Sequence, residues 1–132
     1  MSIDLESSRK MIAGSEFIKY LGIELLELDE TKAKGRMPFG DKACNPFGTM
    51  HGGSLYALAD TIAGTLADPT GKDVVTVDGS LKFLEAAYNT RYVYCDAAII
   101  RRGKHLTTVE VSITGDDGRL LDCGLFSFFR KG

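Results

Sequence analysis

The most regular hydrophobic pattern in the chain lies between residues 52 and 67. Its apolar residues recur at intervals of three and four, at Leu55, Leu58, Ala59, Ile62, Ala63 and Leu66. This period of about 3.6 residues predicts an α-helix, and residues 68–71, which include proline and glycine, predict its end. Because few polar residues interrupt the segment, we expect this helix to be buried on most sides.

Strand patterns dominate the rest of the chain. Segments rich in β-branched and aromatic residues, separated by turn sequences such as residues 115–118, predict four strands after the helix. Two shorter strands are expected before it, on either side of a polar turn, and a short amphipathic helix is expected near the N-terminus. The predicted segments are 8–20 for this helix and 23–26, 32–37, 74–84, 91–100, 106–114 and 120–129 for the strands.

This order of elements predicts an α+β fold, in which an antiparallel sheet wraps around one long central helix. The chain has 132 residues, enough for one domain with a real core, and it contains no internal repeat or long linker. We therefore expect a single domain over residues 1–132.

Composition argues against several classes of protein. The formal net charge of -2 provides no basic field for binding nucleic acid. No apolar run approaches the roughly 20 residues that span a bilayer, and residues 1–10 lack the layout of a signal peptide. The three cysteines show no CxxC spacing, and two histidines without a Cys/His cluster favour no metal site. We expect a cytoplasmic protein with reduced thiols.

The first candidate for chemistry lies directly before the long helix. Residues 45–53 read Asn-Pro-Phe-Gly-Thr-Met-His-Gly-Gly. Gly52 and Gly53 are poor helix formers, each costing about 1 kcal/mol relative to alanine, so they favour close approach of a ligand or of the sheet. Unpaired N–H groups and the dipole of a first helical turn can hold a developing oxyanion.

The second candidate is Asp60, which lies within the otherwise apolar helix. An unpaired buried carboxylate is costly, so such a residue is usually paired, functional or both. Burial would raise the pKa of Asp60 and make it a better general base. The alternatives are an exposed stripe with Tyr56 and Gly64, or a structural hydrogen bond.

Together these features resemble a known family. The pattern of an asparagine, an HGG triplet and an LADT tetrad closely resembles the phenylacetyl-CoA-type and human-like acyl-CoA thioesterases of the hotdog superfamily. It occupies Asn45, residues 51–53 and residues 58–61, and the resemblance runs from about Phe17 to the C-terminus. It implies a hotdog fold and an enzyme that hydrolyses acyl-CoA to a carboxylic acid and free CoA, with CoA as part of the substrate and no separate cofactor.

The resemblance also implies roles for individual residues. Asp60 matches the catalytic carboxylate, acting as general base or nucleophile, and Gly52 matches the residue whose backbone N–H polarises the thioester carbonyl. His51 and Asn45 match residues that orient the substrate and the oxyanion turn. Thr76 lies where relatives carry a serine or threonine that helps to place the attacking water.

A compact basic cluster is a candidate for binding CoA. It consists of Arg101, Arg102, Gly103 and Lys104, and it lies where relatives contact the CoA phosphates. Solvated charges at a strand end are the alternative. Residues 84–87, Leu-Glu-Ala-Ala, depart from the family, which often has a basic residue or serine followed by proline there.

The spacing along the helix predicts a site shared by two chains. Gly52 and Asp60 lie eight residues apart, or about 12 Å at 1.5 Å per residue, whereas a base and an oxyanion donor must each come within roughly 3 Å of the reacting groups. One straight helix cannot supply both. We therefore expect a homodimer or a dimer of dimers.

Other functions remain to be weighed against hydrolysis. A non-catalytic acyl-CoA binding or sensing domain is the main alternative, because one fold serves many functions. A hotdog dehydratase would pair an acid with a histidine at a different spacing. A Cys-His-Asn hydrolase built from Cys44, Asn45 and His51 is disfavoured, since such groups normally come from distant parts of a chain.

Overall fold

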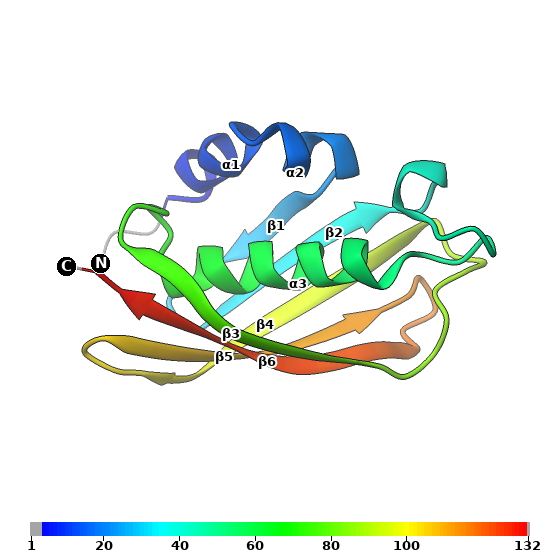
Figure 1. Ribbon diagram of the computed structural model, residues 1–132. Helices are drawn as coiled ribbons and strands as arrows, with labels where there is room; N and C mark the ends of the chain where they lie inside the picture. Colours follow the sequence, from blue (N-terminus) through cyan, green and yellow to red (C-terminus); the bar gives the residue numbers. More distant parts are fainter. Residues whose placement is uncertain (1–3, 132) are drawn as a thin grey trace.

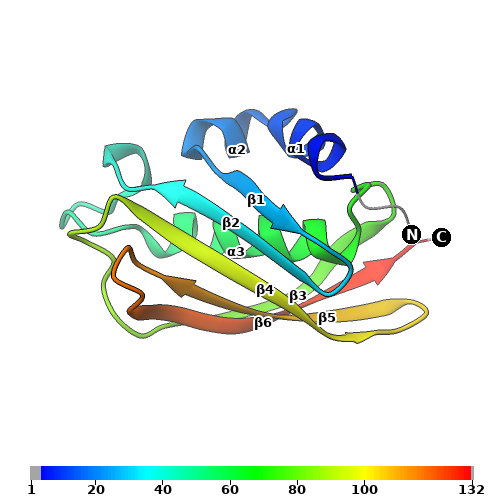
Figure 2. The ribbon, with the colours of Figure 1, turned by 180° about the vertical axis from the view of Figure 1, so that it is seen from behind.

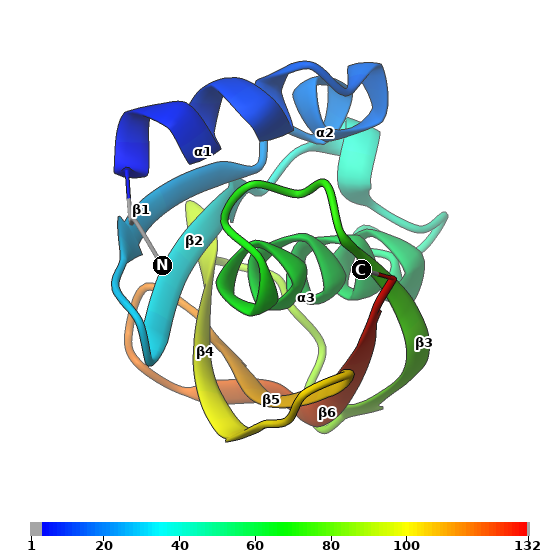
Figure 3. The same cartoon turned by 90° about the vertical axis from the view of Figure 1, so that its left-hand side faces the viewer.

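The computed structural model describes residues 4–131, and it confirms the predicted α+β hotdog fold. A six-stranded antiparallel sheet curls around the long helix α3 (Figures 1 and 3). The strand order across the sheet is β1-β2-β4-β5-β6-β3. The elements are α1 (Leu5–Ala13), α2 (Glu16–Leu21), β1 (Glu24–Leu28), β2 (Lys32–Pro38), the 3₁₀ helix η1 (Asp41–Ala43), α3 (Gly52–Ala67), β3 (Val74–Phe83), β4 (Tyr92–Arg102), β5 (Leu106–Thr114) and β6 (Leu120–Arg130).

Helix α3 lies in the concave face of the sheet and forms the centre of the core. Its apolar residues Leu58, Ile62 and Leu66 are completely buried, as the helical period predicted. Gly35 of β2 allows this close packing, because a Cβ atom there would stand 2.2 Å from Cδ1 of Ile62. The absence of a side chain at Gly35 therefore lets α3 pack closely against β2.

The connections between strands place β3 at one edge of the sheet. Strands β1 and β2 form a hairpin whose turn is held by Asp29, which accepts hydrogen bonds from the backbone N–H groups of Thr31 and Lys32, both at 2.8 Å. Strand β3 follows α3 and, in the part of the chain that the structure describes, pairs with β6 alone. Seen from behind, β1 and β2 lie above β4, β5 and β6 (Figure 2). The sheet therefore ends in β1 on one side and in β3 on the other.

The prediction of one N-terminal helix over residues 8–20 is wrong. The segment forms two helices, α1 and α2, because Gly14 ends the first and Ser15 caps the second by accepting a hydrogen bond from the Ile18 N–H at 3.2 Å. Figure 3 shows both helices beside α3, on the side that the sheet leaves open. Among residues 4–131, no helix is both long and apolar enough to cross a membrane.

Candidate active site

The turn that leads into α3 is held by Asn45. Its side-chain oxygen accepts hydrogen bonds from the N–H groups of Phe47 and Thr49, at 2.9 and 3.2 Å, and its amide nitrogen donates to the Thr49 hydroxyl at 2.7 Å. Asn45 thus fixes the backbone conformation of the turn that precedes the helix. A role of Asn45 in orienting the substrate stays a prediction.

His51 is the N-cap of α3. Its Nδ1 atom accepts a hydrogen bond from the Gly53 N–H at 2.7 Å, and its backbone N–H donates to the Ala43 carbonyl at 2.7 Å. Within residues 4–131 no such acceptor is found for the Gly52 N–H. Its N–H is therefore available at the positive end of the helix dipole, where an oxyanion would be stabilised.

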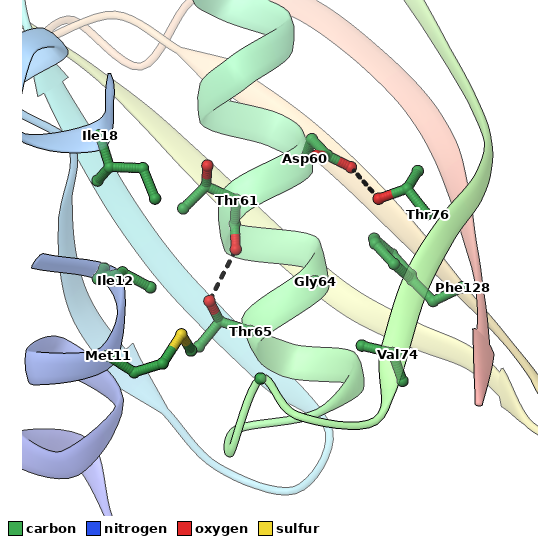
Figure 4. A pocket seen from close by; sticks show the side chains of 11 residues that line it. Met11, Ile12, Ile18, Asp60, Thr61, Gly64, Thr65, Val74, Thr76 and Phe128 are labelled. Carbon is green, nitrogen blue, oxygen red and sulfur yellow. Dashed lines mark hydrogen bonds between the residues drawn. The ribbon is translucent and has the colours of Figure 1, made fainter. Parts of the chain in front are cut away.

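Asp60 lies in the middle of α3 and faces strand β3. The Thr76 hydroxyl donates a hydrogen bond to Oδ1 of Asp60 at 2.7 Å (Figure 4). Burial raises the pKa of Asp60 above its ordinary value, although the bond from Thr76 acts in the opposite direction. The structure thus brings two predicted site residues together, sixteen positions apart in the sequence.

Asp60 and Thr76 open onto a cavity of about 230 Å³, which we call the Asp60 cavity. Figure 4 shows its walls, to which α1, α2, α3 and β3 all contribute. Apart from Asp60 and the threonine hydroxyls the lining is mainly apolar, formed by Met11, Ile12, Ile18, Val74 and Phe128. This arrangement suits an apolar group whose reactive end lies at the carboxylate.

Gly52 does not line the Asp60 cavity. It lines a separate depression with Leu55, Phe83 and Leu84 at the N-terminal end of α3. Eight residues of helix separate Gly52 from Asp60, about 12 Å at 1.5 Å per residue, and both lie in the same unbroken helix. One chain therefore presents the two predicted catalytic groups in different places.

The basic cluster divides into two parts. Arg102, at the end of β4, donates hydrogen bonds to the carbonyls of Leu66 and Ala67 at the C-terminal end of α3, and to that of Glu30. Its guanidinium thus satisfies orphan carbonyls of the helix. Arg101 and Lys104 are exposed to solvent, so contact of this cluster with CoA phosphates stays a prediction.

Sequence reasoning missed a completely buried acid, Asp122 in β6. It is 0% exposed, and within residues 4–131 neither of its carboxylate oxygens has a hydrogen-bond partner. Burial raises its pKa to about 7. Asp122 pairs in register with Phe83, whose ring would stand 3.2 Å from a Cβ atom at Gly52. The only sequence signal was an acid within a predicted strand.

The three side chains that could form a Cys-His-Asn site are used in other ways. Asn45 bonds within its own turn, His51 caps α3, and Cys44 forms a bridge with Met50 through the backbone. Among residues 4–131, no group of three or more histidine, cysteine or acidic side chains could hold a metal ion.

A carboxylate beside an apolar cavity, together with a backbone N–H at a helix start, suits the hydrolysis of an activated acyl compound. Comparison with known proteins agrees. Residues 47–121 match the model of the thioesterase superfamily, so the chain belongs to that family and is a thioester hydrolase with a hotdog fold.

Two curated relatives illustrate the degree of sequence identity. A curated relative from Haemophilus influenzae is 30% identical over 119 residues, covering 88% of this chain and 85% of its own. The acyl-coenzyme A thioesterase PaaI of Escherichia coli is 24% identical over 108 residues, covering 82% and 77%.

Two solved structures show the same fold. A thioesterase from Haemophilus influenzae superposes with a TM-score of 0.88 at 23% identity, covering 98% of this chain and 91% of its own. A hypothetical thioesterase protein from Streptococcus pneumoniae with coenzyme A gives 0.84 at 23% identity, covering 93% and 96%.

Proposed function

We propose that this protein is an acyl-CoA thioesterase in which Asp60 acts as the catalytic carboxylate. As a general base, Asp60 takes a proton from a water molecule that attacks the thioester carbon, and the Gly52 N–H stabilises the oxyanion. CoA then leaves as its thiolate, which takes up a proton, and the acid product forms. The same geometry also permits direct attack by Asp60 as a nucleophile.

The observation that carries the proposal is the hydrogen-bonded pair of Asp60 and Thr76 at an apolar cavity. The Thr76 hydroxyl fixes one carboxylate oxygen, so the other oxygen is free to bind the attacking water. The cavity beside the pair receives the acyl group, and burial holds the pKa of Asp60 above its ordinary value. A thioester is activated enough to react without a metal ion or a cofactor.

A second copy of the chain completes the site in this proposal. The helix keeps Gly52 and Asp60 about 12 Å apart, so the Asp60 that serves a given Gly52 belongs to a partner helix. Strand β3 supports this arrangement, since it is an edge strand with exposed apolar residues, Val77 at 54% and Phe83 at 55%. Such an edge is a surface for pairing with another chain, and a two-fold axis would produce two equivalent sites.

The substrate's CoA moiety is proposed from chemistry and from relatives. The exposed Arg101 and Lys104 could contact phosphates, and one structural neighbour contains coenzyme A. Replacing both residues with glutamine should weaken binding of acyl-CoA more than it lowers kcat, because the phosphates lie far from the carbonyl. A truncated acyl thioester without the nucleotide is the control and should be unaffected. Equal loss for both substrates would contradict the phosphate contact.

The direct test of the function is release of free thiol from a panel of acyl-CoA thioesters, read with a thiol reagent. We expect the wild-type protein to release thiol and the Asp60→Asn variant to release almost none. Binding of acyl-CoA without turnover by the wild-type protein would instead favour the alternative, a non-catalytic acyl-CoA binding domain.

The shared site is tested by mixing two inactive chains, one carrying Asp60→Ala and the other disabled at Asn45. A mixed dimer should have one site with both defects and one with neither. Up to about half of the wild-type activity per heterodimer should therefore return. Heterodimers that stay inactive, or a monomer that is fully active, would contradict the two-chain site.

A further inference from the structure

Part of the lining of the Asp60 cavity comes from a segment that lies outside the family match. The match covers residues 47–121, which include Asp60, Gly64 and Thr76. Three other lining residues, Met11, Ile12 and Ile18, come from α1 and α2 near the N-terminus. The reactive end of the cavity is thus formed by the matched segment, whereas its far wall is formed by α1 and α2, which precede that segment.

This wall is held in place by two long-range hydrogen bonds from α1. The buried hydroxyl of Ser8 donates to the Pro69 carbonyl at 2.9 Å, and Nε of Arg9 donates to the Leu25 carbonyl at 2.9 Å. The first bond joins α1 to the turn that follows α3, and the second joins it to β1. Helix α1 is therefore attached both to the turn that contains the lining residue Gly71 and to β1, and these two bonds hold the wall in position.

Met11 contacts the turn between α3 and β3. A Cβ atom added at Gly71 would stand 2.7 Å from the sulfur of Met11 and 2.9 Å from its terminal methyl group. Gly71 has a φ angle of +69°, a conformation that a glycine adopts without strain. The turn therefore packs against the Met11 side chain, which is 37% exposed and lies at the opposite end of the cavity from Asp60 (Figure 4).

From these contacts we propose that Met11 sets the maximum length of the acyl group that this enzyme accepts. The inference rests on the proposed function, because it places the acyl group in the Asp60 cavity with its carbonyl at Asp60. Met11 then contacts the far end of the acyl group and takes no part in the reaction. The mainly apolar wall favours acyl groups without charge, whether aliphatic or aromatic.

The dimensions indicate a compact acyl group. Along α3 the cavity extends from Asp60 to Thr65, about 7.5 Å at 1.5 Å per residue, which is roughly the length of a six-carbon chain or of a phenyl ring with one methylene. Its volume of about 230 Å³ is smaller than the pockets of roughly 300 Å³ and more that bind drug-sized ligands. Long-chain acyl groups would meet Met11 before their carbonyl reached Asp60.

The test compares kcat/KM over a series of straight-chain acyl-CoA thioesters for the wild-type protein and for Met11→Ala. Removing the side chain beyond Cβ should move the preferred length up by about two to three carbons, and each added methylene that now fits should raise kcat/KM by roughly tenfold. The shortest substrates should be hydrolysed at an unchanged rate. Ile18→Ala enlarges the same cavity from α2 and provides a second variant if the first does not fold.

Two control variants separate cavity size from general effects on α1. Met11→Leu keeps the volume, and Lys10→Ala removes an exposed neighbouring side chain, so both should keep the wild-type length profile. Wild-type turnover with an unchanged profile in Met11→Ala and Ile18→Ala would overturn the role of the wall while leaving the thioesterase function intact. Absence of thiol release from every acyl-CoA by the wild-type protein would overturn the function and this inference together.

Discussion

Asp60 and Asp122 are both acids in the interior of the molecule, yet their surroundings differ. Asp60 is half-buried, accepts a hydrogen bond from Thr76 and opens onto a cavity. Asp122 is completely buried, and within residues 4–131 neither oxygen has a hydrogen-bond partner. Burial raises the pKa of both. A raised pKa therefore does not identify a catalytic acid, because the acid must also be accessible to substrate and held in position.

The largest expected effect concerns catalysis by Asp60. Asp60→Asn keeps the shape of the side chain but removes the base, so kcat should fall by about 10²–10⁴-fold. Steady-state kinetics with an acyl-CoA that the wild-type enzyme hydrolyses measures this loss. The matched variant Asp122→Asn should retain near-normal kcat. A reversed outcome for the two variants would exchange the roles assigned to the two acids.

Asp122 is expected to make the free energy of unfolding depend on pH. The pKa of Asp122 is about 7 in the folded protein and near 3.9 in an unfolded chain. Between these values the unfolded state loses its proton first, so the free energy of unfolding falls as pH rises from about 4 to about 7 and then levels off. The full difference is on the order of 4 kcal/mol, from roughly three pKa units.

Asp122→Asn should remove this pH dependence. Urea unfolding at pH 5 and pH 8 measures it as the difference between wild-type and variant, so that contributions from other groups cancel. The variant should be more stable than the wild-type protein at pH 8, and its advantage should shrink toward pH 5. A difference that does not change with pH would show that Asp122 has a partner in solution.

A smaller effect is expected from the bond between Thr76 and Asp60. Thr76→Val removes a hydrogen bond that stabilises the ionised carboxylate, so the pKa of Asp60 should rise and the acidic limb of the pH profile should move to higher pH. We expect kcat to fall by about tenfold, and Thr76→Ser should restore both quantities. An unchanged pH profile in Thr76→Val would limit Thr76 to a structural contact.

The smallest effect is expected at the start of α3, where His51 caps the helix. His51→Ala removes the side chain that caps the Gly53 N–H, which should lower the free energy of unfolding by about 1 kcal/mol. Thermal unfolding measures it, and His51→Asn should recover most of the loss because asparagine is a good N-cap. If His51 also orients the substrate, His51→Asn should remain impaired in kcat/KM although its stability is restored.

Local patterns predicted most of the fold. The bounds of α3 and β5 agree with the predicted segments, because their periodicity reflects burial on one face or several faces of a regular element. The break at Gly14 and Ser15 was missed, since the apolar positions continue through both helices. The pairing of Asp60 with Thr76 was expected only from the family resemblance, and the structure shows it as a hydrogen bond.

The inward position of Asp122 shows why alternation along a strand has limits. Ile113 of β5 pairs with Asp122, whereas the next residue of β5, Thr114, pairs with Leu120. This irregularity places one extra residue in β6, and Leu121 and Asp122 are both buried. A strict two-residue alternation would have placed them on opposite faces. The register of a strand depends on its neighbour and is not encoded in its own sequence.

The sequence by itself determined the central helix, the number of strands, and an acid and a pair of glycines at a defined spacing. These features depend on residues that are close in the sequence and on helical geometry. Each can therefore be predicted from a single segment of the chain. The tertiary structure alone decided that Met11 lies opposite Asp60 in one cavity, and that Asp122 is buried with no hydrogen-bond partner among residues 4–131. Such contacts join segments that are distant in the sequence, and the packing of the whole chain sets them.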